Sequence, residues 1–402
     1  MEGGSLDTSS SINLITISST TIKAFLSDRS SGSYSRLVDK LLNSKRFGER
    51  WGRHWLDVVR YAQTNGYERD DEKPNAWRYR DYVINAFNTD KPYDRFILEQ
   101  LAGDELILEA FNKNKPFVEG GDEGLIATGF YRLGVWDDEP DDKLQAEYDG
   151  LDDILRTTTE TFLGLTAGCA RCHDHMFDPI SQKDYYSMLA YFRNVRNYEK
   201  PSDKGIIQRQ IEGGKALSIS EHGTVAPETH VLIRGEASKP SIEVQPRVPD
   251  VFSALSPEPE PAEKSSGRRL ALAKWITDSS NPLTARVMVN RIWQYHFGRG
   301  IVDSPNDFGR AGKPASNLEL LDWLASEFVK SKWSIKHMHR VIMNTAAYQR
   351  SSDNNSENFD KDPGNEHHWR MNLRRLEAET IRDRVLQISG QLNNKRGGPS
   401  FY

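Results

Sequence analysis

The two cysteines of this 402-residue chain lie three positions apart, in the stretch GCARCHDHMFDP that spans residues 168 to 179. Cys169, Cys172 and His173 fit the pattern C-x-x-C-H, which is typical of covalent haem attachment. Thiols at this spacing can reach the two vinyl groups of one haem, and the histidine that follows can bind the iron. The pattern therefore predicts haem c on Cys169 and Cys172, with His173 as an axial ligand.

The same stretch also contains side chains that could bind a metal ion directly. A structural zinc site needs about four ligands, and His173, His175 and Asp178 lie close enough in sequence to complete the cysteine pair. Zinc, iron or calcium held by His173, His175 and Asp178 is therefore the alternative to haem. A redox or structural pair of cysteines is a third interpretation, although a thioredoxin-like motif is expected in a βαβ unit and these surroundings read as helical.

A second group of polar side chains lies in RHWLDVVRYAQTNGYERD, which ends at Asp70. On a helix, His54, Asp57 and Tyr61 are spaced by three and four residues and share one face. Such a face could line a catalytic pocket, in which His54 acts as acid or base and Asp57 orients it. The alternative is a surface face with ion pairs, while the tryptophans of the same stretch fill the core.

Two arginines stand near aromatic side chains in NRIWQYHFGRG, residues 290 to 300. Arg291 and Arg299 could bind haem propionates, or a sulfate or carboxylate group of a substrate. The alternative is that the aromatic side chains form an interdomain core and the arginines bridge helix ends. The acidic stretch GVWDDEPDD, residues 134 to 142, is interpreted as a solvated loop, although its oxygens could bind calcium.

Hydrophobic spacing predicts a mainly α fold, in which two helical domains are joined by a small β-containing segment and a Pro/Glu-rich linker. The short runs KALSIS and THVLIRG read as strands that pair with each other. The expected division is an irregular N-terminus over 1–22, a helical cytochrome-type domain with the C-x-x-C-H motif over 23–200, the β segment and linker over 201–267, and a second helical domain over 268–402.

Composition limits the classes of function. Charged residues make up 28% of the chain and hydrophobic residues 37%, with a formal net charge of -5, so no concentrated basic face for nucleic acid is expected. No apolar run approaches the ~18 residues of a membrane helix. The N-terminus lacks the cationic start and apolar core of a signal peptide, which predicts either a cytosolic protein or a fragment of a longer exported one.

The motifs together resemble the planctomycete-type cytochrome c domain-containing proteins, which carry two linked domains of unknown function. The first domain's pattern appears as RFGERWGRHWLDVVRYAQTNGYERD, PYDRFILEQLAGD and TFLGLTAGCARCHDHMFDPISQKDYY. The second appears as NPLTARVMVNRIWQYHFGRGIVDSPNDFGRAGKPASNLELLDWLASEFV and RRLEAETIRDRVLQISG. The resemblance covers nearly the whole chain after about residue 22.

The resemblance implies an exported or periplasmic redox or electron-transfer protein, linked to oxidation or processing of polysaccharide. Its expected partners are a redox protein and a polysaccharide or sulfated sugar. The alternative functions are a metal-dependent hydrolase and a non-catalytic module of a carbohydrate-processing assembly. Family members often carry a further cytochrome-like domain upstream, which this chain lacks, and the chain stops at GGPSFY, before the family's usual end. These departures predict a truncated member of the family.

Overall fold

The computed structural model describes residues 19–112, 121–196 and 208–399, and within them the fold is mainly α, as predicted. The expected irregular segment 1–22 lies outside the described residues as far as residue 18, and a helix begins at Ser19. The helices are α1 (Ser19–Ser27), α2 (Ser33–Leu42), α3 (Arg46–Val58), α4 (Ala76–Asn88), α5 (Tyr93–Asn112), α6 (Gly121–Ala127), α7 (Lys143–Thr158), α8 (Gln182–Leu189), α9 (Arg268–Thr277), α10 (Thr284–Phe297), α11 (Leu318–Lys330), α12 (Ile335–Met343), α13 (Ser356–Lys361) and α14 (Ala378–Ile388). Shorter helical turns are η1 (Thr128–Arg132), η2 (Thr159–Leu163), η3 (Ala167–Arg171), η4 (Ile233–Gly235) and η5 (Asp250–Leu255).

The β segment forms two separate hairpins. Strand β1 (Gln208–Ile211) pairs antiparallel with β2 (Gly214–Leu217), and β3 (Thr229–Leu232) pairs antiparallel with β4 (Pro240–Val244). The prediction that KALSIS and THVLIRG pair with each other is therefore wrong. A tight turn after Ile211, with Gly213 at φ 73°, brings β2 against β1, its nearest neighbour in sequence.

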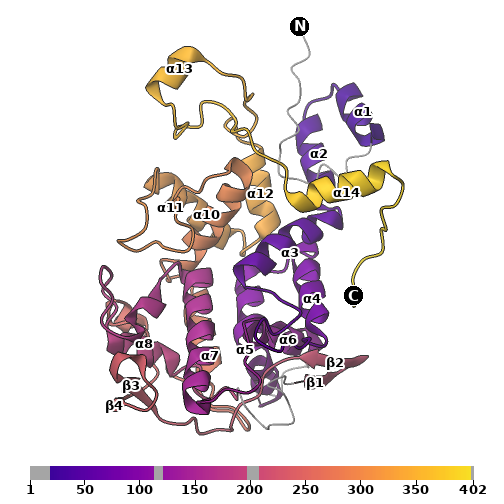
Figure 1. Cartoon of the computed structure of the whole chain (residues 1–402). Helices are drawn as coiled ribbons and strands as arrows, with labels where there is room; N and C mark the ends of the chain where they lie inside the picture. The colour runs from indigo at the N-terminus through magenta and orange to yellow at the C-terminus, as the bar shows by residue number, and fades with distance from the viewer. Residues whose placement is uncertain (1–18, 113–120, 197–207, 400–402) are drawn as a thin grey trace.

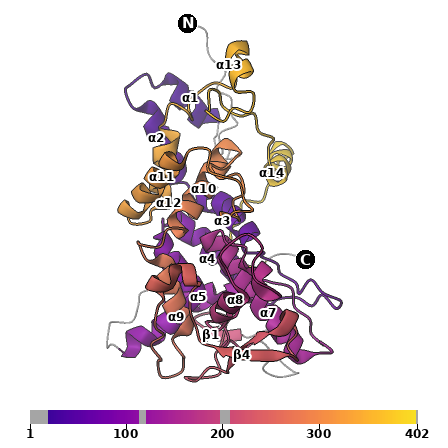
Figure 2. The same ribbon diagram turned by 90° about the vertical axis from the view of Figure 1, so that its left-hand side faces the viewer.

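One hydrophobic core runs through both helical parts of the chain. Helices α3, α4 and α5 of the first part pack together, and α9 of the second part lies against α5 (Figures 1 and 2). The close approach of α3 to α4 needs glycine, since a Cβ on Gly48 would lie 2.2 Å from the carbonyl oxygen of Ile84. None of the helices in the described ranges combines the length and apolar character that a membrane crossing requires.

The C-x-x-C-H motif lies on a compact loop between α7 and α8. Helix α7 passes into the π-turn η2, and the chain then reverses at Gly164, whose φ of 60° suits a residue without a side chain. The motif begins in the turn η3 and is followed by α8. Ser181 and Asp184 form a capping box at the start of α8, so both ends of the loop are held by regular structure.

Candidate functional site

The three motif side chains face solvent. Cys169 and Cys172 are free, exposed thiols, and His173 is exposed beside them. Gly235 of η4 approaches Cys172 closely, since a Cβ on Gly235 would lie 3.2 Å from the Cys172 sulfur. The motif residues are therefore exposed, and the Cys172 thiol lies beside the turn of the β3–β4 hairpin.

The hydrogen bond of His173 determines which ring nitrogen is available. Its Nδ1 lies 2.7 Å from the backbone oxygen of Asp174. A carbonyl oxygen can only accept, so Nδ1 carries the proton and the lone pair of the neutral ring is on Nε2. A histidine that binds a metal usually donates its other N–H to a carbonyl or carboxylate in this way. His173 is thus in the tautomer that a ligand through Nε2 requires.

His175 lies only two positions further on, but it is buried and both its ring nitrogens are engaged. Its Nδ1 accepts the backbone N–H groups of Phe177 at 3.2 Å and Asp178 at 2.8 Å. The proton of the neutral ring is therefore on Nε2, which lies 3.1 Å from the Thr166 hydroxyl. His175 closes the loop onto itself and has no nitrogen directed to a ligand.

Asp178 joins the loop to the second helical part. Its Oδ1 accepts the backbone N–H of Arg310 at 2.7 Å, and a Cβ on Gly309 would lie 2.2 Å from its Oδ2. The Oδ2 atom is buried, accepts no hydrogen bond from a described residue, and lies 3.6 Å from His175 Nδ1. Within the described residues no three His, Cys, Asp or Glu side chains are grouped as metal ligands, so the structure does not bring His173, His175 and Asp178 together.

Apolar and charged side chains frame the exposed motif. Met176 is 79% exposed and Phe177 is 50% exposed, next to His173 in sequence. Arg171, inside the motif, forms ion pairs with Asp149 and Asp152 of α7, the latter at 3.3 Å. The ion pairs anchor the loop to α7, and the loop exposes two apolar side chains shortly after His173.

The predicted shared face of His54, Asp57 and Tyr61 is wrong, because α3 ends at Val58. Arg60 follows with a φ of 54°, and Tyr61 lies beyond the helix, where its hydroxyl accepts a hydrogen bond from Gln63 at 2.7 Å. Asp57 is exposed and pairs with Arg53 at 3.2 Å.

His54 is buried against the second helical part. Its ring stacks on Tyr295, with ring centroids 3.8 Å apart, and its Nε2 lies 3.8 Å from a carboxylate oxygen of Glu377. Burial, and next the positive charge of Arg50, lower the pKa of His54 to about 2. An acid or base works best with a pKa near the working pH, so this histidine is suited to packing rather than proton transfer.

Arg291 and Arg299 have structural partners, and the structure does not bring them together. Arg291 is buried and donates to the backbone oxygens of Thr161 and Glu160 within η2, the latter at 2.8 Å, and to Asn306 at 3.0 Å. Arg299 is exposed and pairs with Asp303 at 3.3 Å. Arg291 therefore ties α10 to the helix that leads into the motif. This matches the alternative interpretation of the sequence for Arg291, in which the arginine has a structural role between helices.

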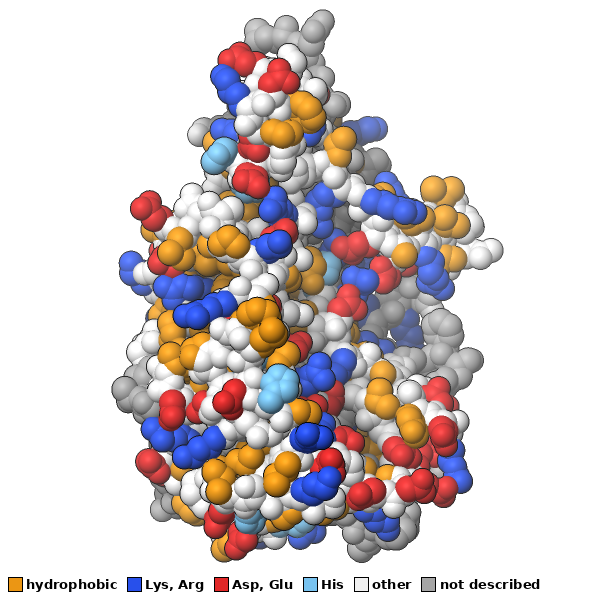
Figure 3. Space-filling view, turned by 60° about the vertical axis from the view of Figure 1, so that its left-hand side comes forward, with side chains coloured by type: hydrophobic (Ala, Val, Ile, Leu, Met, Phe, Trp, Pro, Cys, Tyr) orange, Lys and Arg blue, Asp and Glu red, His pale blue; other side chains and the backbone are white. Residues whose placement is uncertain are grey.

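Positive and negative side chains are interspersed over the face in Figure 3. This agrees with the small formal net charge of the chain.

Comparison with known proteins identifies two domains in the chain. Residues 14–197, which include the motif loop, match PSCyt2, a protein of unknown function (DUF1549). Residues 268–402 match PSD1, a protein of unknown function (DUF1553). No curated protein and no solved structure matches the chain. The two linked domains expected from the sequence are therefore both present.

Proposed function

We propose that the chain, which carries a PSCyt2 and a PSD1 domain of unknown function, is a c-type haem protein that transfers electrons. Cys169 and Cys172 would hold the haem and His173 would be its axial ligand through Nε2. The observation that carries the proposal is the contrast between two neighbouring histidines. His173 is exposed in the tautomer of a ligand, whereas His175 uses both nitrogens within the loop.

The chemistry of attachment requires accessible thiols. Each S–H adds across one vinyl double bond, so that the sulfur bonds to one carbon and the hydrogen goes to the other, and no oxidant is consumed. Cys169 and Cys172 meet this requirement because both are free and exposed. When bound, haem iron supplies one-electron transfer. The exposed side chains of Met176 and Phe177 offer apolar surface for one edge of the macrocycle.

The remaining residues of the loop hold this arrangement in place. His175 and Asp178 fix the backbone after the motif, and the ion pairs of Arg171 hold the motif itself against α7. An exposed haem would be accessible to a redox partner protein, which suits electron transfer. We extend the proposal to oxidation or processing of polysaccharide in an exported compartment, as the source of those electrons.

The proposal is tested with the full chain secreted from a host that has c-type maturation machinery. Acid-denatured protein is expected to retain a pyridine haemochrome band of about one haem per chain. Cys169→Ser together with Cys172→Ser should abolish this covalent band. His173→Ala should keep the thioethers but shift the visible spectrum, because the iron loses its axial ligand.

His230→Ala is the control, since this histidine lies on β3 and should leave the spectrum unchanged. If the matured protein contains no covalent haem but about one zinc, iron or calcium ion per chain, the haem proposal is wrong and a metal-dependent function takes its place.

A further inference from the structure

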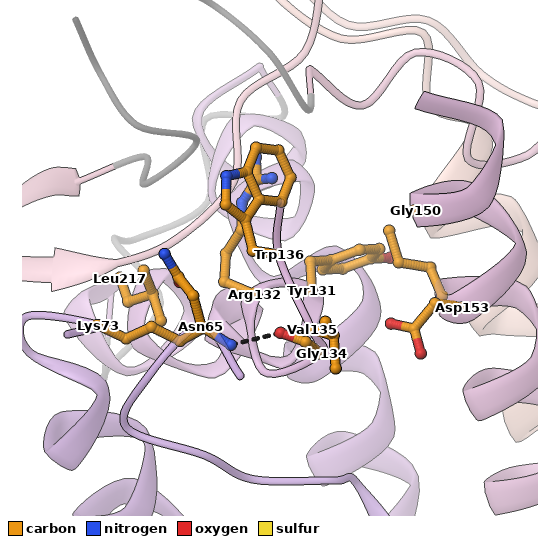
Figure 4. Close-up of a pocket in the computed structure, with 11 residues that line it drawn as sticks. Asn65, Lys73, Tyr131, Arg132, Gly134, Val135, Trp136, Gly150, Asp153 and Leu217 are labelled. Atoms are coloured by element: carbon orange, nitrogen blue, oxygen red, sulfur yellow. Dashed lines mark hydrogen bonds between the residues drawn. The ribbon is translucent and has the colours of Figure 1, made fainter. Parts of the chain in front are cut away.

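A pocket with a polar interior lies in the first domain and includes none of the motif residues. It is formed by the loop that bridges Thr64 to Glu72, by η1 and the residues after it, by α7 and by β2 (Figure 4). The side chains that matter here are Asn65, Lys73, Arg132, Val135, Trp136 and Asp153. Its volume is about 30 Å³, which is enough for one or two water-sized groups.

Two of the charged groups that line the pocket, Asp153 and Arg132, are already committed to protein partners. Arg60 donates to both carboxylate oxygens of Asp153 at 2.9 Å. Arg132 donates to the backbone oxygens of Ser218 at 3.2 Å and Arg196 at 2.5 Å. No guanidinium fork is therefore directed to an anion such as sulfate or carboxylate, and the ligand that fits is neutral.

Asn65 and Lys73 are held side by side by the backbone of their loop, and Figure 4 places both on the same wall of the pocket. The Asn65 N–H donates to the Asp71 oxygen at 2.8 Å, and the Lys73 N–H donates to the Gln63 oxygen at 2.7 Å. The backbone carbonyl oxygen of Asn65 also accepts the backbone N–H of Trp136 at 2.9 Å. These bonds fix the two side chains relative to each other.

The two side chains offer one donor and one acceptor to the pocket. Lys73 is 4% exposed, and its ammonium donates to the backbone oxygens of Leu133 and Gly134. An ammonium has three N–H groups, so the third can donate to a ligand in the pocket. Asn65 is 1% exposed, and its amide nitrogen faces the Asp138 carboxylate at 3.4 Å. Its amide oxygen is buried and accepts no hydrogen bond from any residue that the structure describes.

Burial lowers the pKa of Lys73 and so weakens its preference for a charged partner. Desolvation, and next the charge of Arg60, lower the pKa of Lys73 to about 8. A buried acceptor without a partner costs ~1–3 kcal/mol, so filling the position beside Asn65 and Lys73 is favourable.

We propose that this pocket binds a neutral polyhydroxylated molecule by one hydroxyl group, which accepts from Lys73 and donates to Asn65. A hydroxyl is the group that meets a donor and an acceptor at once, and its size fits the pocket volume. The carbon face of the molecule would rest on Trp136 and on Val135, which is 70% exposed at the mouth. This inference does not depend on haem, and it favours uncharged over sulfated sugars.

The test is a titration of the full chain with D-glucose by saturation-transfer NMR, with sodium sulfate as the charged competitor. Binding with a dissociation constant of about 1 mM is expected from the few atoms engaged. Asn65→Leu, which removes the acceptor at similar volume, should weaken binding about tenfold. Val135→Glu should weaken it as much without affecting folding, because Val135 is exposed.

Val225→Glu is the matched control, since Val225 is 82% exposed and does not line the pocket. Retained binding in this variant together with its loss in Val135→Glu would support the site. The proposal is overturned if the native protein shows no saturable glucose signal, if sulfate displaces the sugar, or if a crystal grown with glucose holds only water beside Asn65.

Discussion

The Nδ1 atom of His175 accepts the backbone N–H of Asp178 at 2.8 Å, and this bond closes the loop that carries the exposed thiols. The same ring faces the Thr166 hydroxyl at the other end of the loop. His175 therefore stabilises the loop from inside through these hydrogen bonds, while the His173 side chain is exposed to solvent.

This division predicts different effects for the two histidines. His175→Ala should lower the free energy of unfolding by about 2 kcal/mol, because two buried backbone N–H groups lose their acceptor. His173→Ala should change it by less than about 0.5 kcal/mol, because this side chain is exposed. Urea unfolding of the haem-free protein measures both. Equal destabilisation by the two changes would contradict the assignment.

Three buried histidines at the domain contact predict a steep loss of stability in acid. Burial lowers the pKa of His54 to about 2 and of His296 to about 3, and burial, with His296 next, holds that of His339 well below its ordinary range. The unfolded chain binds protons on these groups below pH 6.5 while the folded chain does not. Stability is therefore lost as the pH falls, by up to ~4 kcal/mol per pH unit for three groups.

Urea unfolding between pH 7 and 5 checks this dependence. His54→Phe preserves the stacking on Tyr295. It should reduce the slope of the free energy of unfolding against pH by the amount that corresponds to one bound proton. His367→Phe is the control, since His367 is exposed and its removal should leave the slope unchanged. A His54→Phe slope equal to that of the native protein would show that this histidine titrates normally.

The two arginines near the aromatic stretch are expected to differ sharply. Arg291→Met should lower the free energy of unfolding by about 3 kcal/mol, because the carbonyls of Glu160 and Thr161 within η2 lose a buried charged donor. Arg299→Met should lower the free energy of unfolding by less than about 0.5 kcal/mol, since the ion pair of Arg299 is exposed. Thermal unfolding compares them. A large loss of haem content with unchanged stability in Arg299→Met would instead indicate a propionate contact.

A buried cluster of charges between α5 and α9 predicts a second pH dependence, of opposite sign. Arg269 is fully buried and pairs with Asp104 at 2.8 Å and with Glu221 at 2.9 Å. Burial raises the pKa of the neighbouring Glu105 from 4.5 to about 8, against the opposing effect of Arg269. The folded chain keeps this proton after the unfolded chain has released it, so stability falls as the pH rises toward 8.

The slope of the free energy of unfolding between pH 7 and 8, where most histidines of the unfolded chain have lost their proton, checks this effect by comparison of two variants. Glu105→Gln should flatten the slope, because the amide stays neutral at every pH. Glu109→Gln, one turn further along α5 and paired with Lys274 at the surface, is the matched control. Persistence of the slope in Glu105→Gln would assign it to another group of the cluster.

The sequence by itself determined the chemistry of the motif and the class of fold. Cys169, Cys172 and His173 are adjacent in the chain, so their spacing alone carries the prediction of haem attachment. Helical periodicity is also local, and it predicted the mainly α fold and the helix that leads into the motif. The long family patterns predicted the two domains that the comparisons identify.

Only the tertiary structure decided which polar side chains face a ligand. His54 and Arg291 are buried by contacts between residues more than 100 positions apart, which no local pattern records. The roles of His173 and His175 depend on burial and on the tautomer that each hydrogen bond selects, although the two residues are nearly adjacent. The pairing of Asn65 with Lys73 depends on a folded loop against η1 and α7. Hydrogen bonds and burial arise from packing, so they appear only once the chain has folded.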